Sequence, residues 1–129
     1  MSGAIRALVV VAVFVAAGCG NAAPPGAPLK IDTVDVQFPS SCGGVGLPPF
    51  RVERDGDALQ FIDVGTGDVR HDLVWPGGFF ARLNNGVATL YSATGAVVAR
   101  EHDVLGNAGG CPRSDGRILV DEPGEASSS

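Results

Sequence analysis

Apolar and polar residues alternate along this 129-residue chain in short stretches that glycines interrupt. Val34, Val36 and Phe38 alternate with Asp35 and Gln37, which places the apolar side chains on one face of an extended strand. After the first 18 residues, no segment keeps a 3.6-residue apolar period for three turns, and 19 glycines disfavour long helices. The pattern therefore predicts an all-β fold.

Glycine-containing turns predict two hairpins. Asp55-Gly56-Asp57 separates two alternating segments, and an Asp-Gly step favours a tight turn because glycine tolerates positive φ. Ser92-Ala93-Thr94-Gly95 separates segments 87–91 and 96–100 in the same way. Further strands are expected at 71–75, 79–83 and 117–120.

About six to eight short strands are thus expected in a folded unit that spans residues 30–120. A sheet of this kind avoids bare edges by closing on itself. We therefore expect a small closed or nearly closed β-barrel, with a β-sandwich as the alternative. Residues 121–129 hold acidic residues, a proline, a glycine and terminal serines, and are expected to be disordered.

The first 18 residues have the organisation of a cleavable signal-peptide helix. Arg6 precedes an apolar stretch from 7 to 17, and the small residue Gly18 lies at the expected cut. An apolar stretch of about 11 residues suits a signal peptide and is shorter than the ~20 residues that span a bilayer as a helix. The segment is therefore predicted to be a signal and not an anchor.

Val15-Ala16-Ala17-Gly18-Cys19 resembles the lipobox of bacterial lipoproteins, in which Leu or Val, a small residue, and Gly or Ala precede the cysteine. Ala16 takes the first of these positions, and Val15 lies one place earlier. The resemblance implies that Cys19 receives a diacylglyceryl group and becomes the first residue after cleavage. An ordinary secretory signal with an unmodified Cys19 is the alternative.

Three cysteines are an odd number for an exported chain. If Cys19 carries lipid, then Cys42 and Cys111 remain and are predicted to form a disulfide. A metal site at these two residues is the alternative, but neither has a second Cys or a His at ligand spacing. Neither a metal nor a cofactor is expected.

Residues 19–29 are predicted to form a tether, because three prolines among alanines and glycines leave little to bury. Loss of Arg6 leaves 8 basic residues against 14 acidic ones, a net charge near −6. Such a chain is a poor partner for nucleic acid, and anionic lipids repel it. We therefore expect the Cys19 lipid alone to attach it to the extracytoplasmic face of the cell membrane.

Residues 73–111 contain Leu-Val-Trp-Pro-Gly-Gly at 73–78, Gly-Ala-Val-Val-Ala-Arg-Glu-His-Asp-Val at 95–104, and a glycine-rich turn before Cys111. This stretch resembles a pattern of small uncharacterised bacterial lipoprotein domains. The resemblance implies a small barrel of the oligonucleotide/oligosaccharide-fold type and no particular activity. The chain departs from the pattern at His102, where the pattern has glycine.

Signals for catalysis and metal binding are weak. His71-Asp72 and His102-Asp103 match the His-Asp step of metal-dependent hydrolases, but neighbouring side chains on a strand point to opposite faces and cannot share an ion. No Gly-x-Ser-x-Gly motif marks a nucleophilic serine. Residues 63–68 place oxygen ligands around glycines, yet lack the third carboxylate and distal Glu of an EF-hand loop, so a plain turn is favoured.

Trp75, Phe79 and Phe80 are the candidate binding residues. They flank Pro76-Gly77-Gly78 at a predicted strand end, where exposed aromatic residues bind sugars, peptides or proteins. The alternative, which we favour for Trp75, is that its ring plugs one end of the barrel while Pro76-Gly77 makes the turn.

Three functions remain compatible with the sequence. The first, which we favour, is a non-catalytic envelope domain that binds a ligand such as a glycan, or a protein partner. The second is an inhibitor of a cationic envelope enzyme such as lysozyme, which acidity and size suit. The third is a hydrolase with an unrecognised site, which would require a histidine, a carboxylate and a hydroxyl in one cleft.

We expect Cys42 and Cys111 to react with alkylating reagents only after reduction, and Cys19 to stay unreactive because its sulfur carries lipid. The bridge would close a loop of about 70 residues, so reduction should lower the free energy of unfolding by up to about 4 kcal/mol. Mass spectrometry after alkylation and urea unfolding with and without reductant measure the two effects. Alkylation of the unfolded but unreduced chain would contradict the pairing.

Overall fold

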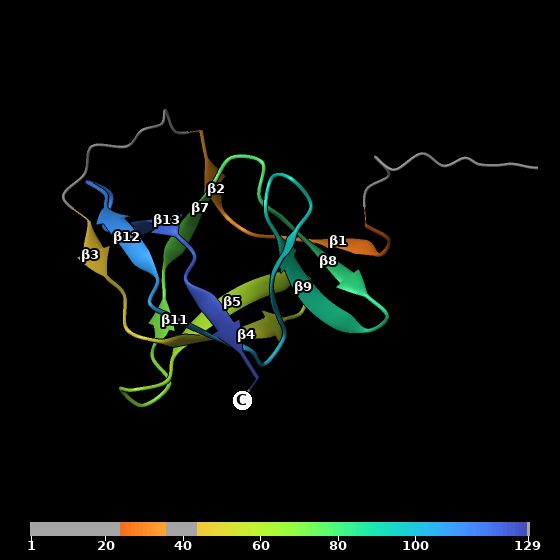
Figure 1. Ribbon diagram of the computed structural model, residues 1–129, viewed down its shortest axis with the longest axis horizontal. Coiled ribbons are helices and arrows are strands. Elements are labelled where there is room, and N and C mark those ends of the chain that lie inside the picture. Colours follow the sequence, from red (N-terminus) through yellow and green to blue (C-terminus); the bar gives the residue numbers. More distant parts are fainter. Residues whose placement is uncertain (1–23, 36–43, 129) are drawn as a thin grey trace, which may run out of the picture.

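The computed structural model describes residues 24–35 and 44–128. Cys19, Cys42 and the predicted signal peptide lie outside these residues. All the regular secondary structure in these residues is β-strand, so the all-β prediction is confirmed. The same residues contain no helix that could cross a membrane. Three open sheets surround one core (Figure 1). A single closed barrel is not observed, and the arrangement is closer to the alternative, a sandwich of sheets.

The first sheet is antiparallel and has the order β1-β8-β9-β10. Asn85 and Gly86 connect its central strands with φ angles of 53° and 79°, as in an Asn-Gly hairpin turn. This Asn-Gly step is a sequence signal for a third hairpin beyond the two predicted. The predicted hairpin at 92–95 is confirmed, since the Gly95 N–H donates to the Ser92 carbonyl at 2.9 Å. The strands are β1 (Ala27–Leu29), β8 (Phe80–Asn84), β9 (Val87–Tyr91) and β10 (Val97–Arg100).

The second sheet is also antiparallel and has the order β14-β11-β4-β5-β6. Its longest pairing is the predicted hairpin, in which Asp55 lies opposite Ala58 and Gly56 takes a φ of 62°. That prediction is confirmed. The strands are β4 (Phe50–Asp55), β5 (Ala58–Asp63), β6 (Arg70–His71), β11 (Val104–Gly106) and β14 (Glu125–Ser127).

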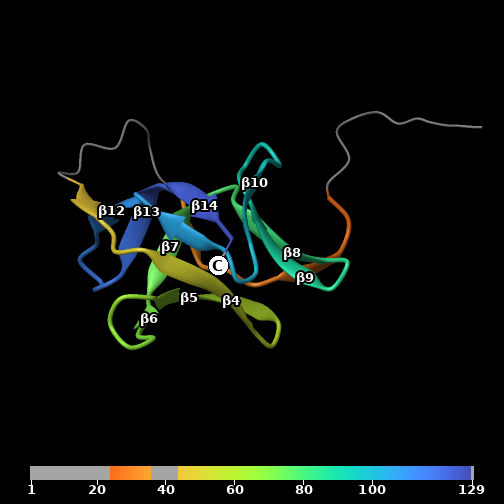
Figure 2. The ribbon, with the colours of Figure 1, turned by 60° about the horizontal axis from the view of Figure 1, so that its bottom comes forward.

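The third sheet mixes parallel and antiparallel pairs in the order β2-β7-β13-β12-β3. β7 (Leu73–Pro76) pairs in parallel with β2 (Thr33–Val34) on one side and β13 (Ile118–Glu122) on the other. β12 (Gly109–Pro112) and β3 (Val45–Gly46) continue the sheet antiparallel to one another. Figure 2 shows this sheet on the opposite side of the molecule from β8 and β9, with β4 and β5 between them.

Both ends of the described fold extend past their predicted boundaries. β1 takes up residues 27–29 of the expected tether, and β14 pairs with β11 although the sequence predicts disorder from 121 onward. Glycine permits both close approaches: a Cβ on Gly26 would lie 2.2 Å from the Leu83 carbonyl oxygen, and one on Gly124 would lie 2.1 Å from that of Gly106. Backbone hydrogen bonds to neighbouring strands hold both segments in place. Amino-acid composition therefore did not predict that these segments are ordered.

Trp75 lies at the centre of the core, with an exposed fraction of 0%. The rings of Phe61 and Phe79 contact it at centroid distances of 5.3 and 5.7 Å, and Phe50 meets Phe61 edge-on at 5.8 Å. The indole Nε1 is buried and has no hydrogen-bond partner in the described part of the chain. Trp75 is therefore an interior packing residue, in line with the interpretation that we favour, and it is not an exposed binding residue.

Replacing Trp75 should test its place in the core. Trp75→Ala should lower the free energy of unfolding by about 3–5 kcal/mol, because it leaves a large cavity among aromatic rings. Trp75→Phe should cost less than half as much, because it keeps an aromatic ring and removes the unpartnered N–H. Urea unfolding followed by circular dichroism measures both. A loss below about 1 kcal/mol for Trp75→Ala would contradict the role of this ring in the core.

Candidate functional site

The predicted binding aromatics do not form one exposed patch. Phe79 packs on buried Trp75, whereas Phe80, the next residue, stacks on Tyr91 with ring centroids 5.0 Å apart. The Arg82 guanidinium lies 5.7 Å from the Phe80 ring centroid. The structure thus divides the three candidate residues between the core and a separate stack, in which Phe80 is half-buried and Tyr91 is buried.

His71 is paired with a buried carboxylate. Its Nε2 lies 3.2 Å from Oδ2 of Asp63, within ion-pair distance although the atoms are not aligned for a hydrogen bond. Asp63 Oδ1 accepts the backbone N–H of Gly65 at 2.7 Å, which holds the pKa of the carboxyl below its usual range; the Thr66 hydroxyl and His71 contribute in the same direction. The Asp63 N–H donates to the Val69 carbonyl and closes the loop, which is a turn as expected.

The order of groups around His71 does not match a hydrolytic triad. In a triad the imidazole lies between the carboxylate and the hydroxyl, so that it can take the hydroxyl proton. Here the Asp63 carboxylate lies between His71 and the Thr66 hydroxyl. The ring of His71 also packs against Phe50, with a centroid distance of 6.3 Å. This arrangement ties the 63–69 turn together through Asp63 and differs from that of a catalytic triad.

His102 occupies a turn position that usually requires glycine. Its φ is 76°, and the Asp103 N–H donates to the Arg100 carbonyl at 2.9 Å across the turn. Positive φ at the third residue is typical of a type II turn. The chain therefore keeps a glycine-like backbone at the position where it departs from the lipoprotein pattern. Histidine is among the residues that tolerate this conformation best.

Two carboxylates flank the exposed imidazole of His102. Nδ1 lies 3.3 Å from Glu53 Oε2, and Nε2 lies 3.7 Å from Glu101 Oε2. Glu53 also accepts a hydrogen bond from Arg51. Partial burial of Glu53 opposes its ionisation, but Arg51 and His102 outweigh this and lower the pKa of the carboxyl. In the residues that the structure describes, no group of three or more His, Cys, Asp or Glu could hold a metal ion.

Cys111 is buried at β12, with an exposed fraction of 5%. Its predicted partner, Cys42, lies outside the described residues, so the pairing stays a prediction. The glycines before Cys111 belong to the end of β11 and the start of β12. Gly110 packs tightly there, since a Cβ would lie 2.5 Å from Cγ2 of Ile118.

A hollow opens where the chain crosses from one sheet to another. The Lys30 N–H donates to the Asp57 carbonyl beside β5, and the Trp75 N–H donates to the Asp32 carbonyl beside β7, each at 2.8 Å. Residues 30–32 therefore bridge the second and third sheets. β6 pairs with the far end of β5 and places Arg70 across from this bridge. The hollow has a volume of about 210 Å³ and is lined by Lys30, Ile31, Asp32, Ala58, Leu59 and Arg70.

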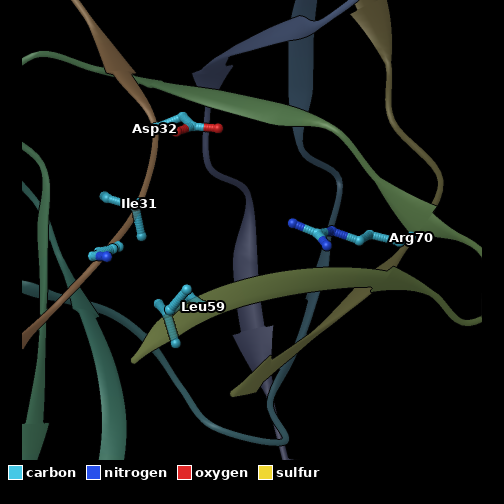
Figure 3. A pocket seen from close by; sticks show the side chains of 6 residues that line it. Ile31, Asp32, Leu59 and Arg70 are labelled. Carbon is cyan, nitrogen blue, oxygen red and sulfur yellow. The ribbon is translucent and has the colours of Figure 1, made fainter. Parts of the chain in front are cut away.

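Figure 3 shows the Arg70 side chain pointing into this hollow, with Ile31 and Leu59 on the opposite side. In the described part of the chain, the Arg70 side chain has no ion pair or hydrogen bond. The other charged residues of the hollow are paired: Lys30 Nζ lies 3.3 Å from Asp57 Oδ2, and Asp32 Oδ2 lies 3.6 Å from Arg117 Nη1. Sequence reasoning missed this site because its residues are distant in the chain and form no motif.

Comparison with protein-family models, with curated proteins and with solved structures finds no match to this chain. The resemblance of residues 73–111 to small lipoprotein domains therefore stays a prediction.

We expect the backbone of the turn at His102 to distinguish two substitutions. Both His102→Gly and His102→Ala remove the imidazole and its carboxylate contacts, so they differ mainly in their tolerance of positive φ. The alanine variant should be less stable than the glycine variant by about 1 kcal/mol. Urea unfolding monitored through Trp75 fluorescence measures the difference. Equal stability of the two variants would contradict the left-handed conformation of this residue.

Proposed function

We propose that this protein is a lipid-anchored lipoprotein of the cell envelope whose β-domain binds a ligand or a protein partner without catalysing a reaction. The lipobox resemblance at 15–19 supports the anchor, and the acidic composition makes direct adsorption to anionic lipid unfavourable. The proposal keeps the cellular location that the lipoprotein resemblance implies, the extracytoplasmic face of the cell membrane. It does not include the closed barrel, since the three sheets are open.

The observation that carries the proposal is the short distance in sequence between Cys19 and the first strand. β1 begins at Ala27, so only the seven residues 20–26 separate the cysteine from the fold. Even in a fully extended polyproline conformation, seven residues would span only about 22 Å. A lipid on Cys19 would therefore hold the domain close to the membrane surface.

Two features support binding over hydrolysis. The Asp63 carboxylate interacts with both His71 and the Thr66 hydroxyl, an order unsuited to activating a nucleophile, and the groups that flank His102 are carboxylates at an exposed turn. In contrast, the hollow beside Arg70 offers an arginine without a partner in the described residues next to apolar side chains. Apolar surface with a few convergent polar groups is typical of binding sites.

Substitution of the lipobox cysteine tests the anchor. Wild type should sediment with membranes, incorporate labelled palmitate and run at the mature size. Cys19→Ala should lose the label and the processing step that depends on the lipid. Asn21→Ala, two residues away, is the control and should behave as wild type. Membrane retention of Cys19→Ala at the wild-type size would contradict the proposal.

A further inference from the structure

We propose that the hollow between residues 30–32 and the β5–β6 pair binds a carboxylate that carries a small apolar substituent, with Arg70 as its anion partner. This inference rests on the proposed binding function and names the chemistry of its ligand. The carboxylate belongs either to a small organic acid or to the C-terminus of a peptide, and both present the same group to the site.

Arg70 is the residue that selects an anion. The chain holds 14 acidic residues against 9 basic ones, yet this arginine has no acidic partner in the part that the structure describes. Its side chain points into the hollow, as Figure 3 shows. Successive side chains of a strand alternate in direction, so the pairing of His71 with the core leaves Arg70 on the accessible side. A guanidinium binds a carboxylate through two parallel N–H donors.

Lys30 supplies a second positive charge at the rim. Its pair with Asp57 is weakly held, since the side chains are 78% and 73% exposed and Nζ lies 3.3 Å from the carboxylate. Exposed pairs of this kind contribute little stability. A carboxylate that enters beside Arg70 can therefore also attract the Lys30 ammonium at small cost to the fold.

The apolar wall limits the substituent of the ligand. Ile31, Ala58 and Leu59 line the hollow with aliphatic groups. The volume of about 210 Å³ is below the roughly 300–1,000 Å³ of pockets that enclose drug-sized ligands. The space therefore suits a group the size of one aliphatic side chain next to the carboxylate.

Asp32 selects against ligands of higher charge. Its carboxylate lies on the rim of the same hollow, and Arg117 neutralises it only from a distance of 3.6 Å. A dianion such as phosphate would meet stronger repulsion from Asp32 than a monoanionic carboxylate would. This residue thus distinguishes a carboxylate site from a general anion site.

Titration of the full chain, purified in detergent and labelled with 15N, tests the proposal. N-acetyl-leucine should cause saturable shifts in the amide resonances of Ile31, Ala58 and Leu59. The neutral N-acetyl-leucinamide and inorganic phosphate should each bind at least about tenfold more weakly, because one lacks the charge and the other carries excess charge. Arg70→Gln should weaken N-acetyl-leucine binding by about tenfold. Arg100→Gln, which removes the same charge from β10, should leave it unchanged.

A short peptide that ends in a free leucine distinguishes the two sources. Tighter binding of the peptide than of N-acetyl-leucine assigns the site to a peptide C-terminus, and weaker binding assigns it to a small acid. Equal binding of the acid and the amide, an unchanged affinity in Arg70→Gln, tighter binding of phosphate, or no shifts at all would each overturn the proposal. If the titration fails but the Cys19→Ala experiment shows lipid-dependent anchoring, the carboxylate ligand is excluded while the proposed anchored lipoprotein is still supported.

Discussion

Burial of β7 is the constraint on which the rest of this structure depends. All four residues of Leu73–Pro76 are buried, and Trp75 at 0% exposure contacts both Phe61 and Phe79. A strand buried on both faces needs partners at both edges, because its backbone groups have no water to bind. β2 and β13 supply these partners through parallel pairing, which brings together segments near the start, the middle and the end of the described chain.

The hollow beside Arg70 follows from the same constraint. The chain leaves β1 at the edge of the first sheet and forms β2 beside β7 in the third sheet. Residues 30–32 connect the two strands and pass β5 on the way. β5 is thus bordered by the crossing segment at one end and by β6 at the other. The space between them is where Arg70 faces aliphatic side chains (Figure 3). The site that we propose is therefore a product of how the sheets meet.

Local signals predicted the local parts of the fold. The turns at 55–58 and 92–95 formed as expected, because an Asp-Gly step or a closing glycine sets the turn within a few residues. Local signals did not predict that the two ends of the described chain, β1 and β14, are ordered. Pro-rich and acidic segments carry few apolar side chains to bury, and they are ordered here mainly by pairing with strands β8 and β11. His102 was also not predictable from local signals, because tertiary context holds this non-glycine residue at a φ of 76°.

The sequence by itself determined the secondary-structure class and the two turns, since alternation and turn glycines act over a few neighbouring residues. The segment before Cys19 predicts the cellular location in the same local way. Only the tertiary structure decided that Trp75 is a core residue, that the sheets stay open, and that Arg70 faces a hollow. Exposure and pairing depend on contacts between residues distant in the chain, and a period of two along a strand does not specify which other strand will cover each face.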